Sequence, residues 1–103
     1  MAKKSVVRRN DKRARKVKGQ ASRRADIKAR IYDKTGNVTI AEKFQLSMEL
    51  AGLSRDGSRV RYARRCRLTG RKKGYFRKFN MSRIKLRDLA AYGQLPGVIK
   101  ASW

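Results

Sequence analysis

The sequence contains no histidine, one cysteine (Cys66), one proline (Pro96) and only seven acidic residues among 103. General acid–base and nucleophilic catalysis usually depend on histidine or on paired carboxylates, and zinc sites need several cysteine, histidine or carboxylate ligands. A single cysteine cannot form an internal disulfide. We therefore expect no enzyme, no metal site, no other cofactor and no small-molecule substrate.

Long apolar segments are also missing. No run approaches the roughly 20 apolar residues of a membrane span, and none has the shape of a secretion signal. Because there is neither a span nor a disulfide framework, we expect a soluble protein in a reducing compartment, with no membrane partner.

What the sequence has instead is positive charge. Thirty lysines and arginines give a formal net charge of +23 at pH 7. A chain of this length forms one small domain with tails, and such self-repulsion needs a polyanionic partner. Seventeen of the cations are arginine, whose planar group pairs with phosphate and stacks on bases. This composition favours a nucleic acid over a membrane surface.

The charge divides the chain into three parts. Residues 1–30 have a net charge of +11, residues 31–54 of −1, and residues 55–103 of +13. We interpret them as a basic N-terminal arm, a neutral helical scaffold and a basic RNA-binding C-terminal module. The arm has a thin apolar stripe at helical spacing, which predicts a weakly driven helix: Ala14, Val17, Ala21 and Ala25.

Residues 37–52 carry the clearest helical signal. Thr39 and Glu42 have the spacing of a capping box, and Gly52 stands where a left-handed residue would end the helix. The apolar face predicted to pack is formed by Ile40, Phe44, Met48 and Ala51, broadened by Leu46, Leu50 and Leu53.

A second helix is predicted over residues 82–92, with Ser82 as its N-cap and Gly93 as its stop. Pro96 and Gly97 then predict a turn, followed by a short extended tail. The small core expected around this helix consists of Phe76, Phe79, Leu68, Ile84, Leu86 and Leu89.

A basic loop bracketed by Gly70 and Gly74 lies between the two helices, and glycines allow a backbone to turn tightly against phosphates. The spacing of a Walker nucleotide loop is absent. The density of cations exceeds any internal need, so we expect phosphate contacts, with stacking by Trp103 left open. The predicted RNA-binding residues are Arg59, Arg61, Arg64, Arg65, Arg67, Arg71, Lys72, Lys73, Arg77, Lys78, Arg83, Lys85, Arg87, Lys100 and Trp103.

Four segments resemble the bacterial type of small-subunit ribosomal protein 14, in its longer form: RRCRLTGR (64–71), GYFRKF (74–79), SRIKLR (82–87) and PGVIKASW (96–103). The resemblance implies a structural component of the small ribosomal subunit. It implies binding to the 3′ major domain of ribosomal RNA in the head, beside small-subunit proteins 3 and 10. It further implies roles in subunit assembly and A-site conformation, in ribosomes of the bacterial cytoplasm or of an organelle.

Shorter members of that family hold zinc with two Cys-x2-Cys pairs separated by twelve residues. In this chain the four positions are Cys66, Thr69, Ser82 and Lys85. Zinc needs deprotonated soft ligands, which a hydroxyl and an ammonium do not supply. The departure is typical of the zinc-independent branch, and we interpret Cys66 as a small buried apolar residue.

Together these observations predict a mostly α, small and irregular fold. It has an extended basic N-terminal helical arm, a central helix and a C-terminal loop-helix-tail module that resembles a zinc ribbon without its metal. The main alternative is a histone-like DNA-compacting protein. A membrane-active cationic peptide would need a long amphipathic apolar face, which neither basic region has.

Overall fold

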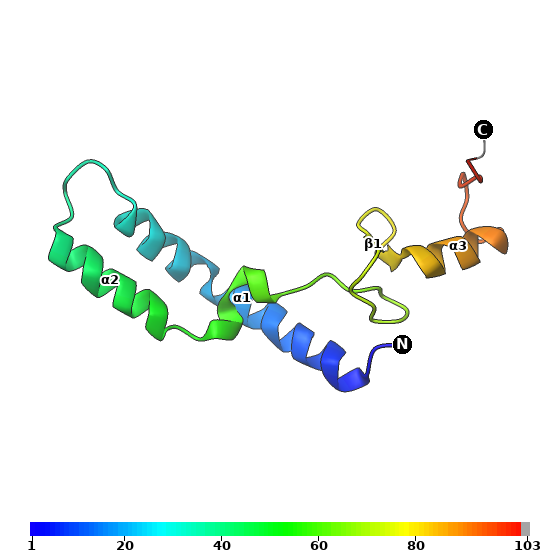
Figure 1. The fold of residues 1–103 in the computed structure, drawn as a ribbon, viewed down its shortest axis with the longest axis horizontal. Coiled ribbons are helices and arrows are strands. Elements are labelled where there is room, and N and C mark those ends of the chain that lie inside the picture. Colours follow the sequence, from blue (N-terminus) through cyan, green and yellow to red (C-terminus); the bar gives the residue numbers. More distant parts are fainter. Residues whose placement is uncertain (102–103) are drawn as a thin grey trace. The chain divides into compact units, whose positions relative to one another are not determined.

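The structure is a computed structural model that describes residues 1–101, so the predicted contact of Trp103 lies outside the described residues (Figure 1). The expected mostly helical architecture is confirmed. Along the chain the elements are α1 (Lys4–Ile31), α2 (Ile40–Gly52), the 3₁₀ turns η1 (Arg55–Gly57) and η2 (Arg59–Arg61), β1 (Tyr75–Phe76), β2 (Met81–Ser82) and α3 (Arg83–Ala91).

The chain forms two compact units. The helical unit is Arg9–Tyr62, and the C-terminal unit is Met1–Arg8 together with Ala63–Trp103, described up to residue 101. These bounds differ from those of the three charge segments, because the first residues of the basic arm belong to the C-terminal unit. A hydrogen bond of 3.0 Å from the Ala2 amide to the Thr69 carbonyl joins these first residues to the rest of the C-terminal unit.

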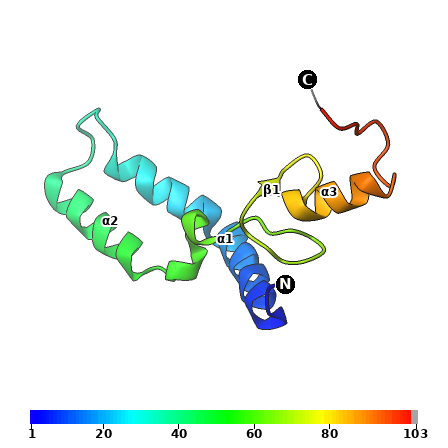
Figure 2. The ribbon, with the colours of Figure 1, turned by 45° about the vertical axis from the view of Figure 1, so that its right-hand side comes forward.

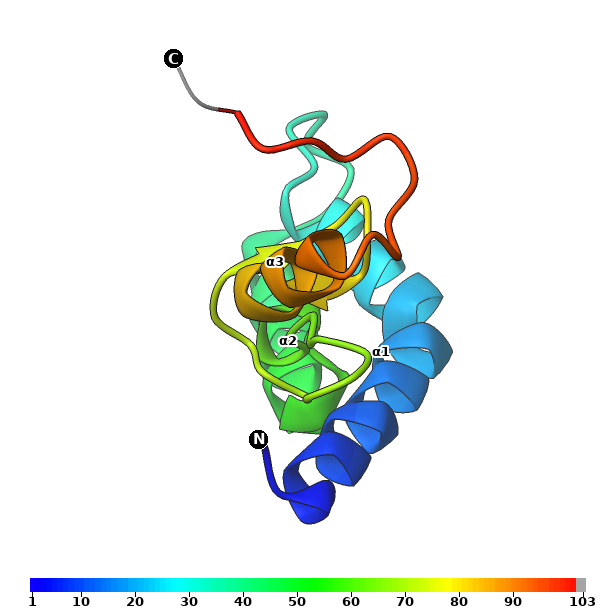
Figure 3. The same cartoon turned by 90° about the vertical axis from the view of Figure 1, so that its right-hand side faces the viewer.

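In the helical unit, α2 lies beside the second half of α1, to which a loop over residues 32–39 connects it (Figure 2). Figure 3 shows the same two helices in a view turned by 90° from that of Figure 1. The buried apolar residue of this unit is Ile27, which is 5% exposed. The predicted capping box is present: Thr39 Oγ1 accepts from the Glu42 amide at 3.3 Å, and the Glu42 carboxylate accepts from the Thr39 amide at 2.9 Å.

Only part of the predicted apolar face of α2 packs, namely the leucines that broaden it. Leu46, Leu50 and Leu53 are half-buried, whereas Ile40 and Phe44 are 89% and 67% exposed. Both faces are apolar, and contacts beyond the helix decide its rotation. Arg23 donates to the Glu49 carboxylate at 2.7 Å, which holds that side of α2 against α1.

The weakly driven helix predicted from the apolar stripe of the arm is present as α1. Ala14 and Val17 of that stripe are half-buried, whereas Ala21 and Ala25 are exposed. One smaller expectation for α2 was wrong. Gly52 ends α2 without a left-handed conformation, since the next residue caps the helix with an extended backbone.

A clamp of polar contacts holds the segment after α2 against α1. Arg13 Nε pairs with Asp56 Oδ1 at 3.1 Å, and Arg61 pairs with the same oxygen at 3.3 Å. Arg24 donates to the Ser54 carbonyl at 2.7 Å. Gly57 is buried against the Gln20 side chain, which leaves no room for a Cβ atom. The chain over Arg55–Gly57 therefore forms a 3₁₀ turn that packs on α1.

The C-terminal unit is built on a short antiparallel hairpin, in which Tyr75 pairs with Ser82 and Phe76 with Met81. Helix α3 follows directly, with the predicted N-cap: Ser82 Oγ accepts from the Lys85 amide at 3.5 Å. Gly93 follows the helix with φ +67°, as a helix stop requires. The predicted turn at Pro96 and Gly97 is also present.

The predicted apolar core of this unit is only partly formed. Phe76, Ile84 and Leu68 are 48%, 46% and 57% exposed, while Phe79, Leu86 and Leu89 are half-buried. Successive residues of a strand point to opposite faces, so Phe76 points away from the face that Ser82 occupies. The centre of the unit is small and is filled by Cys66 and Ser82, which are 3% and 1% exposed.

The packing of the N-terminal residues can be tested at Gly70. A Cβ atom there would lie 2.8 Å from Val7 Cγ2 and 3.1 Å from Ala2 Cβ, at φ +70°. We expect Gly70→Ala to lower the opening free energy at the Cys66 amide by about 2 kcal/mol or more, measured by amide hydrogen exchange. Gly97→Ala is the matched control, because it has φ +75° and nothing within 4 Å. Equal effects of the two variants would contradict the packing.

Candidate nucleic-acid interface

The loop between Gly70 and Gly74 projects cations from a turned backbone. Both glycines have positive φ, +70° and +62°, as the sequence pattern predicted. Arg71, Lys72 and Lys73 are all exposed. Arg71 Nε donates to the Lys73 carbonyl at 3.3 Å, which restrains the loop from within. The loop therefore presents three positive charges in a defined arrangement.

Backbone hydrogen bonds anchor this loop to the rest of the unit. The Cys66 amide donates to the Arg71 carbonyl at 2.9 Å, and the Gly70 amide donates to the Cys66 carbonyl at 2.8 Å. At the other end of the loop, the Arg83 amide donates to the Gly74 carbonyl at 2.7 Å. Both ends of the cationic loop are thus held, although the unit has almost no apolar core.

Cys66 is buried, as expected, but it is more than an apolar filler. Burial raises the pKa of its thiol, and hydrogen bonds from the Thr69 hydroxyl and from the Ser82, Thr69 and Leu68 amides outweigh this effect. They lower the pKa from 9.0 to about 6. The thiolate is therefore the favoured form at neutral pH and ties Ser82 to the loop after Cys66.

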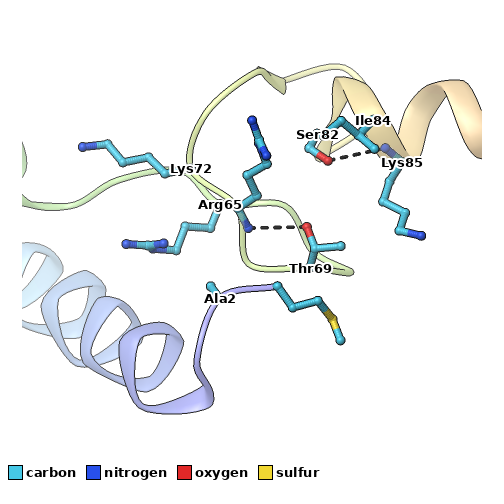
Figure 4. Close-up of a pocket in the computed structure, with 9 residues that line it drawn as sticks. Ala2, Arg65, Thr69, Lys72, Ser82, Ile84 and Lys85 are labelled. Carbon is cyan, nitrogen blue, oxygen red and sulfur yellow. Dashed lines mark hydrogen bonds between the residues drawn. The ribbon is translucent and has the colours of Figure 1, made fainter.

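The four positions that were compared with zinc ligands, residues 66, 69, 82 and 85, lie together around Cys66. Cys66 accepts hydrogen bonds from Thr69 and Ser82, and Ser82 in turn accepts from the Lys85 amide. Beside them lies a depression of about 520 Å³ (Figure 4). The Lys72 and Lys85 side chains point away from each other across it. The cations thus spread over a surface and do not converge on one point.

Most of the predicted RNA-binding residues are exposed in the C-terminal unit, and among the described residues they form no ion pair. These residues are Arg64, Arg67, Arg71, Lys72, Lys73, Arg77, Lys78, Arg83, Arg87 and Lys100.

The other described members of the predicted set have internal contacts. Arg65 is half-buried and donates to the Gly70 carbonyl at 2.9 Å, so it helps to shape the basic loop. Lys85 lies 3.5 Å from the Asp88 carboxylate within α3. Arg59 and Arg61 belong to η2 in the helical unit, where Arg61 pairs with Asp56. The structure does not bring these two arginines into the unit that holds the basic loop.

Sequence reasoning missed the cations at the start of the chain as companions of this loop. Lys3, Lys4 and Arg8 belong to the C-terminal unit and are exposed. The contact that brings them there joins Ala2 to Thr69, far apart in the sequence. The one available signal was Gly70, whose missing side chain leaves room for the N-terminal residues.

No three His, Cys, Asp or Glu side chains in residues 1–101 form a cluster that could hold a metal ion. Within the same residues, no helix has the length and apolar character to cross a membrane.

Comparison with known proteins identifies the family. A sequence profile described as ribosomal protein S14p/S29e matches residues 49–102. The chain belongs to the ribosomal protein S14p/S29e family. Proteins named small ribosomal subunit protein uS14 from Gluconacetobacter diazotrophicus and Rhodospirillum rubrum are each 48% identical to it over 103 residues, all of both chains. The protein of that name from Xanthobacter autotrophicus is 44% identical, again over both full lengths.

Membership of the S14p/S29e family agrees with the chemistry of the described surface. Members are structural, non-enzymatic components of the ribosome, so the chain is a ribosomal protein and the expectation of no enzyme is confirmed. The comparisons do not support the alternative of a histone-like DNA-compacting protein.

The state of the Cys66 thiol can be measured directly. A pKa of about 6, below the ordinary 9.0, means that the folded unit prefers the thiolate. This contribution to stability is complete above pH 9 and disappears as the pH falls through 6. Absorbance at 240 nm should therefore show thiolate formation with a midpoint near pH 6, and Thr69→Val should raise that midpoint by removing a donor. If thiolate formation in the folded protein had a midpoint pH close to that in the denatured protein, this assignment would be contradicted.

Proposed function

We propose that the chain is a structural protein of the small ribosomal subunit that binds ribosomal RNA in the head, within the 3′ major domain. In this role it contributes to subunit assembly and to the conformation of the A site. The name of its relatives, small ribosomal subunit protein uS14, supports the small subunit as its location, and the match over the full length of both chains supports a shared role. The resemblance found in the sequence supports the location in the head.

One observation carries the RNA-binding part of this proposal. Arg71, Lys72 and Lys73 stand exposed on a loop whose two ends are fixed by backbone hydrogen bonds and by glycines of positive φ. A surface shaped in advance loses less conformational entropy on binding than a flexible segment does. The loop therefore suits recognition of a folded RNA and not only general attraction to phosphate.

The spread of the remaining cations supports contact with several phosphates along a backbone. Arg77 and Lys78 lie in the turn of the hairpin, and Arg83 and Arg87 lie one turn apart on α3. Since they lie on the same small unit as the basic loop, they act as affinity contacts, while the fold of the RNA selects the place.

The partners follow from the same proposal. Small-subunit RNA is the main partner, and the resemblance adds small-subunit proteins 3 and 10 as neighbours. The relatives are bacterial proteins, so we place the chain in ribosomes of the bacterial cytoplasm.

We further propose that the C-terminal unit is a zinc ribbon that has lost its metal. Its four former ligand positions are Cys66, Thr69, Ser82 and Lys85. Hydrogen bonds to the Cys66 thiolate from Thr69 and Ser82 take over the role of metal bonds, since they hold the same two loops together. The hydroxyls of Thr69 and Ser82 and the ammonium of Lys85 do not suit zinc.

The role of the basic loop can be tested with charge-matched variants of the full chain. We expect the triple change of Arg71, Lys72 and Lys73 to Gln to reduce incorporation into small subunits. The control changes Lys12, Arg15 and Lys18 to Gln, which removes the same charge from exposed positions of α1. Competition with the wild-type chain during subunit assembly measures both, and the loop variant should incorporate less than the control.

The same two variants separate specific from general binding. Each lost phosphate contact should reduce the slope of log affinity against log salt by about 0.7 to 0.9. We expect a slope smaller by about 2 for the loop variant on small-subunit RNA. Equal incorporation of the two variants would show that the loop does not select the site.

The zinc-ribbon proposal has its own test. We expect the variant with Thr69→Cys, Ser82→Cys and Lys85→Cys to bind one zinc ion per chain, because it restores four thiolates at the proposed positions. Thr69→Cys alone is the control and should bind no stoichiometric zinc. Elemental analysis after dialysis measures the content. A triple variant without zinc, or a wild-type chain with one zinc, would contradict the proposal.

A further inference from the structure

Helix α2 carries a row of large apolar side chains that nothing covers in the structure. Ile40, Phe44 and Met48 follow one another at a spacing of four residues and are 89%, 67% and 62% exposed. We call these three residues the α2 stripe. Clusters of exposed apolar residues on a small, highly charged protein mark surfaces for other molecules.

The α2 stripe is not an unused part of the core. Helix α2 already has an apolar face that packs within the helical unit, because Leu46, Leu50 and Leu53 are half-buried. Turning the stripe inward would move these leucines out. It would also separate Glu49 from Arg23, a contact of 2.7 Å. The stripe therefore stays outward in the folded unit.

The chemistry around the stripe does not suit RNA. Residues 31–54 have a net charge of −1 in a chain of +23. The uncharged residues Ala41 and Ser47 adjoin the stripe in sequence, and the nearby Lys43 donates its ammonium to the Asp33 carbonyl at 2.8 Å. Phosphate contacts need available cations, which dominate RNA affinity. A polyanion thus has little to bind here.

The charge layout indicates the partner that the stripe fits. Proteins that bind RNA are themselves cationic. The regions of net charge +11 and +13 repel such a protein, whereas the segment over residues 31–54 does not.

We propose that the α2 stripe docks on an apolar surface of a neighbouring basic protein of the same ribosomal subunit. This inference rests on the proposed function and adds the surface used for protein contact. The C-terminal unit then serves RNA, and the neutral helix serves the protein neighbour. Large apolar side chains at the centre of such contacts supply most of the binding energy.

The first test identifies what covers the stripe in assembled subunits. The photoreactive amino acid p-benzoylphenylalanine replaces Phe44 in the full chain, and the same replacement at Tyr92, which is 79% exposed, is the control. After irradiation we expect position 44 to give an adduct with another protein that survives ribonuclease. An adduct destroyed by ribonuclease, an adduct between two copies of the chain, or no adduct in subunits that contain the chain would overturn the proposal.

The second test measures how much the stripe matters. Phe44→Gln with Met48→Gln should reduce incorporation in competition roughly tenfold or more, with affinity for naked small-subunit RNA unchanged. Val60→Gln with Tyr92→Gln removes two comparably exposed apolar residues elsewhere and should incorporate like the wild type. Phe44→Leu with Met48→Leu should also incorporate normally, since it keeps the stripe apolar.

These outcomes separate the two proposals. Equal incorporation of the stripe variant and its control would overturn the inference alone, because the wild-type chain would still enter small subunits. Failure of the wild-type chain itself to enter small subunits would overturn the proposed function. Circular dichroism checks that α2 persists in each variant, which Gln favours as a good helix former.

Discussion

Repulsion among thirty cations, opposed by only seven carboxylates, is the constraint on which this structure depends. Two of the acidic residues join segments that are distant in the sequence. Asp56 joins two arginines of the helical unit, and Glu49 fixes the rotation of α2. Exposed ion pairs of this kind stabilise a fold only slightly. Most of the remaining cations stay exposed, so binding of a polyanion that neutralises them would stabilise the protein further.

The C-terminal unit shows how a small fold manages without an apolar core or a metal. Cys66 and Ser82 fill its centre, and hydrogen bonds around the thiolate connect the loops that a larger core would hold together. Polar contacts of this type require accurate geometry, which the positive-φ glycines and the N-cap of α3 supply. The apolar groups left outside, such as Phe76 and Ile84, show that this centre is too small to cover them.

The chain thus combines two kinds of surface with different physics. Phosphate binding by the exposed cations of the C-terminal unit, as proposed, acts at long range and depends on salt, whereas the proposed docking of the α2 stripe depends on close fit and the removal of water. A ribosomal protein that carries both can join RNA to protein during assembly. The neutral segment between two basic regions is what makes this division possible.

The sequence alone predicted the class of partner, because that depends on net charge. It also predicted the capping box of Thr39 and Glu42, the N-cap at Ser82 and the turn at Gly70, because these depend on hydrogen bonding and backbone freedom among residues close in the sequence. Tertiary structure alone decided which apolar face of α2 packs, and that the residues around Ala2 join the C-terminal unit. The reason is physical. A helix with two apolar faces satisfies its own backbone in any rotation, so only contacts with distant segments select one.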